Sequence, residues 1–265
     1  MHRIIISAKR LLRPLVPANV RERIARWRHN RAQRENLKRS AEEVFTSVYL
    51  KNEWGGATGD FCSGLGSTNP QIVGIYINAI TELAGREGFL GARFVDLGCG
   101  DFRVGRQLLP LCGQYVGVDI VAPLVDRNNS VFGTDDIEFI HLDIIRDDLP
   151  SGDVCFVRQV FQHLSNEQIG IVLRKLDRYR WVIITEHQPH LGVLSVPNID
   201  KVHGADIRLR EGSGVFLESP PFSRATTSLE LIAEVPATVG EDATDGVIRT
   251  FLYRPHIHYL AVPIS

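Results

Sequence analysis

The stretch that most constrains the fold is RFVDLGCGDFRVG, residues 93–105. A short hydrophobic run ends in Asp96, and a turn containing Gly98 and Gly100 follows at once. Glycine adopts backbone angles that other residues avoid, and it lets a ligand touch the main chain. Exposed N–H groups at the start of a helix favour an anion such as a carboxylate or a phosphate. The stretch therefore predicts a strand, a ligand-binding turn and a helix.

Strand-like and helix-like segments alternate around this turn. The expected strands are residues 93–97, 115–119, 137–142, 153–157 and 180–186, and the expected helices are residues 71–84, 103–111, 122–132 and 166–177, the last with Ser165 as N-cap. This alternation is typical of a parallel sheet with helices on both faces. Residues 228–236 and 246–254 flank an acidic loop and predict a closing antiparallel pair.

Three acids stand at the ends of successive expected strands. Asp96 precedes the glycine turn, Asp119 ends the second strand and Asp143 ends the third. Doubly wound sheets bind ligands at these strand ends. Arg103 replaces the third glycine of a dinucleotide site, and a carboxylate at Asp96 suits an ammonium group better than a pyrophosphate. The expected ligand has an amine, a ribose and an adenine; taken singly, each acid could instead be a cap or turn residue.

The segments VDLGCGDFRVG, GVDI, HLDI and VRQVFQHLSNEQI resemble four motifs of the class I S-adenosylmethionine-dependent methyltransferases. The resemblance is close over residues 93–190 and extends in outline over 45–255. It implies an α/β, doubly wound, Rossmann-like sheet of seven strands with an antiparallel last strand, and S-adenosylmethionine as cofactor. The cofactor residues that it implies are Asp96 at the amine, Gly98 and Gly100 beside the methionine part, Asp119 and Ile120 at the ribose, and Asp143 with Ile144 at the adenine.

Residues 45–70 form an expected lid over the cofactor. They are rich in glycine and small hydroxyl residues, as a flexible linker would be, but Trp54 favours burial. The segment resembles the lid of phosphoethanolamine-type N-methyltransferases, in which a tyrosine covers the active site and a serine binds the cofactor's carboxylate. The resemblance implies that Ser63 and Ser67 take this carboxylate. Trp54 has no hydroxyl group, so the role of the tyrosine does not transfer to it.

Gln159 and His163 follow the fourth expected strand. In the family, residues just past this strand face the transferred methyl group, and Gln159 stands where many relatives have an acid or an amide. His163 lies on the same side if the turn is helical. Histidine titrates near neutral pH and is the most common general base. We expect His163 to act as base or to orient the substrate; the alternative is that it only orders the loop.

The connection after the fifth strand, residues 186–226, is long enough to predict a substrate-binding insertion. Glu186 and His187 are expected to face the pocket from the strand end. Asp206 and Arg208 alternate with apolar residues, which predicts that both lie on one face of a short strand. Such groups often hold a sugar or another polyol. The alternative is a surface excursion with a salt bridge between Asp206 and Arg208.

Charge is concentrated at the N-terminus. The net charge is −1, yet residues 1–40 hold twelve Lys or Arg and two Glu, a balance of about +10. We divide the chain into a basic, partly helical extension at 1–44 and a methyltransferase domain at 45–265. The extension suits an anionic membrane face or a partner protein, or it is simply solvated. Nucleic acid is not expected, because stacking aromatics are not interleaved with the basic residues.

The predicted function is O-methylation of a sugar or glycan precursor. A small-molecule N-methyltransferase, an aminopropyl transferase and a non-catalytic scaffold are the alternatives. The four cysteines, Cys62, Cys99, Cys112 and Cys155, have no zinc-ligand spacing, so no metal site is expected and reduced thiols in the cytoplasm are predicted. Because the extension is basic, we also expect the protein to work at the inner membrane face. The sequence shows neither a secretory signal nor an apolar run of the ~20 residues that span a membrane.

Overall fold

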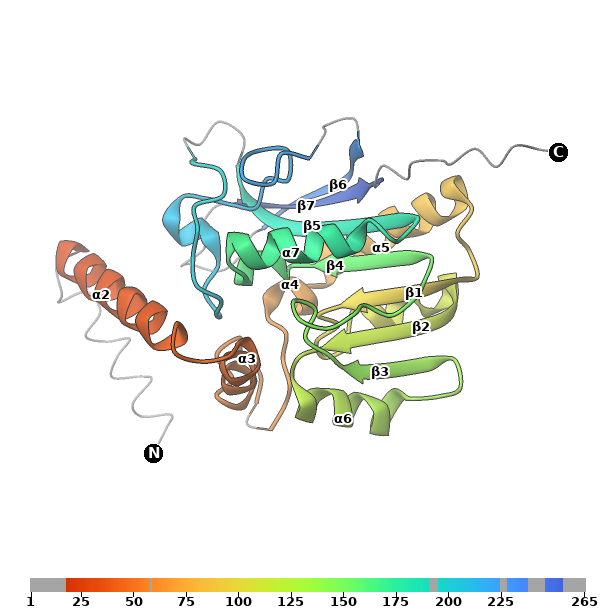
Figure 1. The fold of residues 1–265 in the computed structure, drawn as a ribbon, viewed down its shortest axis with the longest axis horizontal. Helices are drawn as coiled ribbons and strands as arrows, with labels where there is room; N and C mark the ends of the chain where they lie inside the picture. Colours follow the sequence, from red (N-terminus) through yellow and green to blue (C-terminus); the bar gives the residue numbers. More distant parts are fainter. Residues whose placement is uncertain (1–17, 58, 191–194, 225–227, 238–245, 255–265) are drawn as a thin grey trace.

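The computed structural model describes residues 18–57, 59–190, 195–224, 228–237 and 246–254 (Figure 1). The helices are α2 (Ala18–Asn36), α3 (Ala41–Leu50), α4 (Leu65–Thr68), α5 (Pro70–Glu87), α6 (Ala122–Phe132) and α7 (Asn166–Leu176), with 3₁₀ turns η2 (Gly105–Leu111), η3 (Phe161–His163) and η4 (Arg208–Glu211). The strands are β1 (Ala92–Leu97), β2 (Cys112–Asp119), β3 (Ile137–His141), β4 (Val154–Arg158), β5 (Trp181–Pro189), β6 (Leu229–Pro236) and β7 (Gly246–Tyr253). The first 17 residues of the basic extension and most of the predicted acidic loop lie outside these ranges.

The strands form one sheet in the order β3-β2-β1-β4-β5-β7-β6. Strands β1 to β5 are parallel, and β7 is antiparallel to both of its neighbours, β5 and β6. The strand order changes direction between β1 and β4, which is where doubly wound sheets bind ligands. The predicted α/β, Rossmann-like sheet with an antiparallel last strand is confirmed.

Capping side chains set the starts of two helices. Asn69 accepts hydrogen bonds from the N–H groups of Gln71 and Ile72, at 3.0 and 3.4 Å. Ser165 accepts from the N–H of Gln168 at 3.2 Å, and the Gln168 side chain accepts from the N–H of Ser165 at 2.9 Å. The predicted N-cap at Ser165 is confirmed, because this reciprocal pair satisfies two N–H groups that have no partner within the helix.

The segment after the glycine turn differs from the prediction. Residues 103–111 were expected to form an α-helix, but the structure has the 3₁₀ turn η2. Pro110 lies inside this turn, and proline has no N–H group to donate to a helix. Tighter 3₁₀ turns commonly serve as short connectors of this kind.

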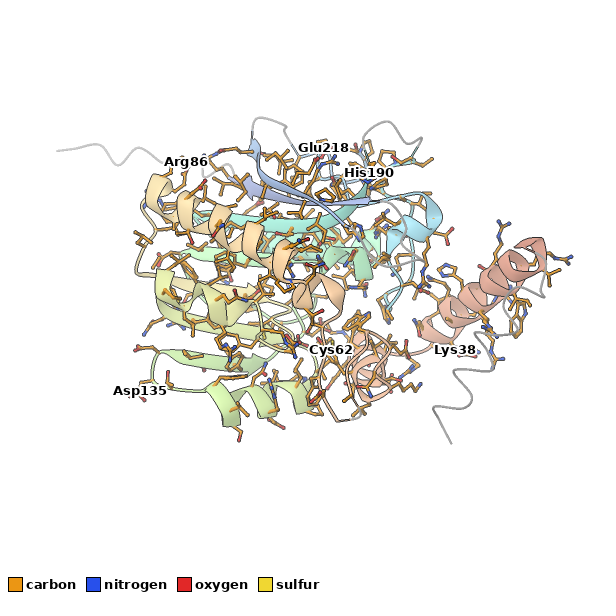
Figure 2. The ribbon with its side chains drawn as sticks, turned by 180° about the vertical axis from the view of Figure 1, so that it is seen from behind. Lys38, Cys62, Arg86, Asp135, His190 and Glu218 are labelled. Carbon is orange, nitrogen blue, oxygen red and sulfur yellow. The ribbon has the colours of Figure 1, made fainter. Side chains whose placement is uncertain are left out.

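Helices cover both faces of the sheet, with α7 in front in Figure 1 and α5 in front in the reverse view of Figure 2. Tyr76 of α5 packs in one core cluster with Phe94 of β1 and Phe156 of β4. Val172 of α7 packs in the opposite cluster with Val157 of β4. Burial of each such side chain stabilises the fold by roughly 1.5–3 kcal/mol. The strand ends therefore have a rigid support.

Helices α2 and α3 lie on the side toward which the parallel strands point (Figure 1). Helix α2 contacts the insertion that follows β5, since His29 Nδ1 lies 3.1 Å from Asp206 Oδ2. Asn36 also donates to the carbonyl oxygen of His203, at 3.0 Å. The expected boundary at residue 44 falls inside α3.

The four cysteines are free thiols. None of the helices in the described part of the chain combines the length and hydrophobicity that crossing a bilayer requires.

Candidate active site

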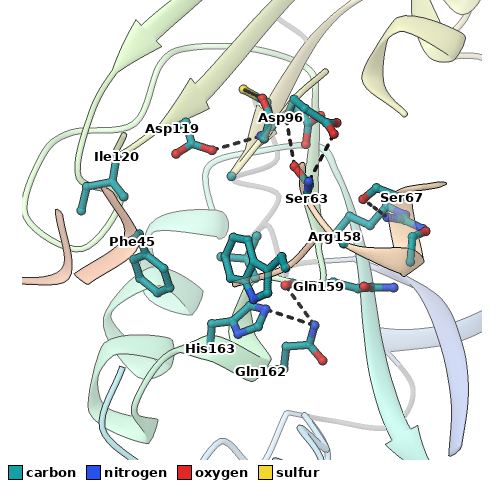
Figure 3. A pocket seen from close by; sticks show the side chains of 18 of the residues that line it. Phe45, Ser63, Ser67, Asp96, Asp119, Ile120, Arg158, Gln159, Gln162 and His163 are labelled. Carbon is teal, nitrogen blue, oxygen red and sulfur yellow. Dashed lines mark hydrogen bonds between the residues drawn. The ribbon is translucent and has the colours of Figure 1, made fainter. Parts of the chain in front are cut away.

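A cavity of about 450 Å³ lies at the carboxyl ends of the central strands (Figure 3). The predicted residues that line it are Trp54, Ser63, Ser67, Asp96, Gly98, Gly100, Asp119, Ile120, Asp143, Ile144, Gln159, His163 and His187. Glu186, Asp206 and Arg208 are not among the lining residues. Segments far apart in the sequence thus converge on one site.

The glycine turn after β1 has the backbone angles that glycine favours. Gly98 and Gly100 have φ values of +73° and +56°. A Cβ atom at Gly98 would lie 2.5 Å from Val160 Cγ2, and one at Gly100 would lie 2.3 Å from Ser63 Oγ. Real side-chain atoms do not approach so closely, so both positions require glycine. The main chain of this turn forms the cavity wall.

Asp96, at the end of β1, is a buried acid with one strong partner. The hydroxyl of Tyr115 donates to Asp96 Oδ2 at 2.5 Å. Burial raises the pKa of Asp96 to about 6, although the Tyr115 hydrogen bond and the positive charge of Arg158 both lower it. The carboxyl group is therefore mainly ionised at pH 7, and it can pair with an ammonium group.

The other two strand-end acids are held by their own main chain. Asp119 accepts from the N–H groups of Gly100 and Val121, at 3.0 and 3.1 Å, and burial raises its pKa to about 6. Asp143 accepts from the N–H of Ile145 at 2.8 Å. A carboxylate has about four lone-pair sites, so each acid keeps acceptor capacity for a ligand.

The arrangement fits S-adenosylmethionine. Asp96, Asp119 and Asp143 line one cavity in the order required by an amine, a ribose and an adenine along the strand ends. Ile120 and Ile144 supply apolar walls beside the last two acids. A flat, apolar base with polar edges is bound well by such walls and a few placed acceptors.

Ser63 is tied to the glycine turn. Its hydroxyl lies 3.0 Å from the Tyr49 hydroxyl and accepts from the N–H of Asp101, also at 3.0 Å. The N–H of Ser63 donates in return to Asp101 Oδ2, at 3.2 Å. Ser67 instead contacts Arg158 Nη1, at 3.4 Å. Sequence reasoning missed Tyr49, Asp101 and Arg158, although Asp101 and Arg158 lie within the quoted segments VDLGCGDFRVG and VRQVFQHLSNEQI.

Aromatic side chains cover part of the cavity. The ring of Trp54 lies 5.0 Å from His163 and 5.1 Å from Tyr49, and Phe45 lies 6.2 Å from Trp54. Trp54 Nε1 also donates to the carbonyl oxygen of Ala205 in the insertion, at 3.4 Å. The segment at 45–70 therefore contacts both His163 and the insertion, while its role as a lid stays a prediction.

The turn after β4 has an unusual backbone. Gln159 has a φ of +57°, in the left-handed region that residues other than glycine rarely adopt. Its N–H donates to the carbonyl oxygen of Thr185 at 2.7 Å, which ties the turn to β5. Backbone strain of this kind is often found at functional sites. The turn directs the chain into η3, which carries His163.

Glu186 holds this turn in place through two hydrogen bonds to its main chain. Its two side-chain oxygens accept from the N–H groups of Phe161 and Gln162, at 2.9 and 3.0 Å. Glu186 is only 2% exposed, and burial raises its pKa to about 8. The expectation that Glu186 faces the pocket is corrected, because successive strand residues point to opposite faces and its neighbour His187 is the one that lines the cavity.

His163 is held in one orientation. Its Nδ1 lies 3.1 Å from the carbonyl oxygen of Gly204, so we assign the proton to Nδ1 and the lone pair to Nε2. Nε2 lies 3.4 Å from the amide nitrogen of Gln162. Burial lowers the pKa of His163 to about 3, and the positive charge of Lys201 lowers it further. The imidazole is therefore neutral at physiological pH.

Four buried polar atoms in this part of the cavity have no protein partner among the described residues: Arg158 Nε, Gln159 Nε2, Gln162 Oε1 and His187 Nε2. Gln162 is 4% exposed and His187 is 7% exposed. Burial also lowers the pKa of His187 to about 4, so its ring is neutral. Unpartnered buried polar atoms are rare and point to a ligand.

The insertion does not present Asp206 and Arg208 as predicted. Residues 208–211 form the 3₁₀ turn η4 instead of a strand, so the two side chains do not share a face. Arg208 is 1% exposed and donates to the carbonyl oxygen of Leu164 at 2.6 Å. Asp206 pairs with His29 and Arg210, so the alternative salt bridge is also wrong. Ile207 and Arg210 line the cavity in their place.

Comparisons with known proteins agree with this geometry. Residues 95–179 match the family model of a methyltransferase domain. The N-methyltransferase NodS from Bradyrhizobium japonicum WM9, solved with S-adenosyl-L-homocysteine, is 14% identical with a TM-score of 0.51, and the match covers 81% of this chain and 99% of NodS. The DhpI–SAH complex is 13% identical with a TM-score of 0.49, covering 80% and 94% of the two chains. A search of curated proteins found no match.

The structural likeness to NodS, at 14% identity, is evidence for the fold alone. The match of residues 95–179 to the methyltransferase domain is more specific evidence than the fold. It includes the ends of β1, β2 and β3, where Asp96, Asp119 and Asp143 line the cavity. Residues 95–179 form a methyltransferase domain, and S-adenosylmethionine is the cofactor of this enzyme.

Proposed function

We propose that this methyltransferase transfers a methyl group to a hydroxyl oxygen of a sugar or glycan precursor. The observation that carries the proposal is the set of unpartnered polar atoms on Gln159, Gln162 and His187, beside the neutral His163. Each unpartnered buried group costs about 1–3 kcal/mol. A polyhydroxylated acceptor supplies donors and acceptors together, so it can satisfy amide and imidazole atoms at once.

The cofactor supplies an electrophilic methyl group. The chain positions the acceptor, and His163 Nε2 accepts the hydrogen bond of the reacting hydroxyl. The oxygen–methyl bond forms as the sulfur–methyl bond breaks, and the hydroxyl proton moves to His163 Nε2. A methylated oxygen that still carries its proton is a strong acid, so a neutral imidazole with a low pKa can accept this proton. The Gly204 carbonyl oxygen at Nδ1 stabilises the resulting cation.

An N-methyltransferase of small amines fits less well. The two acids that would hold an amine do not line the cavity and already have protein partners, Glu186 in the main chain of η3 and Asp206 in His29 and Arg210.

A labelled-methyl assay against matched panels of sugars, nucleotide sugars and amines tests the acceptor class. We expect label on oxygen in the sugar panels, and its loss in His163→Phe with unchanged binding of S-adenosylhomocysteine. Label found only on amines would overturn the proposal. Asp119→Ala is the matched control, because it should abolish cofactor binding and labelling together.

We also propose that the enzyme works in the cytoplasm, at the inner membrane face, and that residues 1–44 act as an extension of the domain at 45–265. Ile24 and Trp27 of α2 are 42% and 61% exposed on one face, with arginines around them. His29 and Gln33, on the opposite face, contact the insertion. A basic helix with an apolar face suits an anionic lipid surface.

Sedimentation with vesicles containing phosphatidylglycerol tests this contact. Wild type should sediment with them and not with phosphatidylcholine alone, and combined Ile24→Ser and Trp27→Ser substitutions should reduce the bound fraction strongly. Val131→Ser, which alters an exposed apolar residue on α6, should have no effect. Equal binding by a chain lacking residues 1–40 would remove the proposal.

A further inference from the structure

Helix α2 presents one polar face to the insertion that follows β5 (Figure 1). His29, Gln33 and Asn36 are spaced by four and three residues, so they lie on the same side of the helix. Gln33 Oε1 accepts from the N–H of Val202 at 2.8 Å, and Asn36 donates to the carbonyl oxygen of His203 at 3.0 Å. The helix therefore holds the main chain of two successive residues of the insertion.

The next residue of the insertion, Gly204, pairs with His163 through both of its main-chain polar groups. The N–H of Gly204 donates to the carbonyl oxygen of His163 at 3.0 Å, and its carbonyl oxygen accepts from His163 Nδ1 at 3.1 Å. A Cβ atom at Gly204 would lie 2.5 Å from Asn36 Nδ2, so α2 packs directly against this residue. Gly204 is thus enclosed between α2 and the histidine of the acceptor end.

Lys201 strengthens the connection between the insertion and η3. Its ammonium group lies 3.4 Å from the carbonyl oxygens of Gln162 and Gly204, and it also donates to the carbonyl oxygen of Asp206. An ammonium group has three N–H donors, so it can serve three carbonyl oxygens at once. The residues on either side of the contact between Gly204 and His163 are therefore held together.

The hydrogen bond at Nδ1 decides how His163 can act. The ring nitrogen that donates to a carbonyl oxygen keeps the proton, and the other nitrogen keeps the lone pair. Gly204 thereby fixes the lone pair of the neutral ring on Nε2, the atom that accepts the hydroxyl proton in the proposed reaction. A displacement of Gly204 would leave the ring free to carry its proton on either nitrogen.

We infer that α2 is a positioning element of the acceptor end: it holds residues 202–204, and this segment fixes the orientation and the protonated nitrogen of His163. The role differs from the proposed membrane contact, which uses the opposite face of the same helix. The effect of α2 on turnover rests on the proposed function, because it requires that Nε2 accepts the proton. Its effect on the histidine ring does not, so the two can be tested separately.

Nitrogen NMR of the histidine rings tests the inference in the full-length protein with S-adenosylhomocysteine bound. Loss of signals in His163→Phe identifies those of His163, which in the wild type should be those of a ring protonated at Nδ1. Combined Gln33→Leu and Asn36→Leu substitutions should move the Nε2 signal toward the protonated range, because the segment is released. Gln33→Glu keeps an acceptor for Val202 and should give the wild-type spectrum, as should Arg34→Ala at an exposed position of α2.

Gly204→Ala disturbs the same contact from the side of the insertion. Its Cβ atom would lie 2.5 Å from Asn36 Nδ2, so either the segment or the Asn36 side chain must move, and the contact with α2 is lost. We expect the same change in the Nε2 signal of His163. Calorimetry should find an unchanged affinity for S-adenosylhomocysteine in both variants, which shows that the cofactor end is intact.

A His163 ring that stays protonated at Nδ1 in both variants would overturn the inference. If the signals do change, the labelled-methyl assay separates the inference from the proposed function. A fall in kcat of roughly tenfold, with an unchanged KM for S-adenosylmethionine, is expected when Nε2 accepts the hydroxyl proton. Changed signals with an unchanged kcat would support the role of α2 and overturn His163 as the proton acceptor.

Discussion

The two ends of the cavity differ in how their polar groups are satisfied. At the adenosine end, Asp119 and Asp143 accept hydrogen bonds from nearby main-chain N–H groups. At the other end, Gln159, Gln162 and His187 keep polar atoms without a protein partner among the described residues. The adenosine end is thus prepared by its own chain, whereas the acceptor end is completed by a ligand.

The difference reflects how each end is built. The adenosine end uses short segments directly after β1, β2 and β3, which the sheet holds side by side. The acceptor end combines the turn after β4, the end of β5 and residues 205–210 of the insertion. A common cofactor needs a constant site, and an acceptor-specific site can vary with its loops.

The largest effect should separate the two ends by chemistry. His163→Ala removes the group that accepts the hydroxyl proton, so kcat should fall by roughly 100-fold or more. Calorimetry should find unchanged affinity for S-adenosylhomocysteine. His141→Ala is the control, because His141 lies outside the cavity and pairs with Glu42. A His163→Ala enzyme that keeps its activity would contradict this distinction between the adenosine end and the acceptor end.

The second-largest effect is expected at the adenosine end of the cavity. Gly100→Ala places a Cβ atom 2.3 Å from Ser63 Oγ, at a φ of +56°. Ser63 cannot easily move, because it is held by Tyr49 and Asp101. Affinity for S-adenosylhomocysteine should fall by about 30-fold, from clash and strain together. Gly85→Ala, in α5 with open space around it, should bind normally.

A pH titration of cofactor binding tests Asp96 and Asp119, the two acids that are assigned to different parts of the cofactor. The pKa values of Asp96 and Asp119 are about 6 in the free protein, and the ligand needs both groups ionised. Affinity should therefore be constant above pH 7 and fall as the pH drops through 6, by up to about tenfold per pH unit for each proton taken up. Asp96→Asn should flatten the curve for S-adenosylhomocysteine and not for methylthioadenosine. A pH-independent affinity between pH 5 and 7 would contradict the assignment.

The smallest effect tests the acceptor end alone. A Cβ atom at Gly66 would lie 2.3 Å from Gln159 Oε1, so Gly66→Ala should displace the Gln159 amide. We expect kcat/KM for the acceptor to fall by about fivefold, with the cofactor affinity unchanged. Gly74→Ala has open space around it and should leave both quantities unchanged. A loss of cofactor affinity in Gly66→Ala would show that the two ends are coupled.

Errors in the sequence analysis fall mostly at the acceptor end. The strands, the antiparallel β7 and the cap at Ser165 follow local patterns, and they are present. Arg158 was missed, because an arginine at a strand end looks like any surface arginine until α4 and α5 pack over it. Asp206 and Arg208 were misplaced, because alternation alone does not distinguish a strand from the irregular chain around η4.

The sequence by itself determined the sheet, the glycine turn and the acids after the strands, since hydrophobic periodicity and glycine angles act over a few residues. Only the tertiary structure decided that Glu186 supports a turn, that His187 faces the cavity and that Arg158 is buried with its Nε lacking a hydrogen-bond partner among the described residues. Burial and partnership depend on segments distant in the chain. They become defined only when packing brings those segments together and removes water from between them.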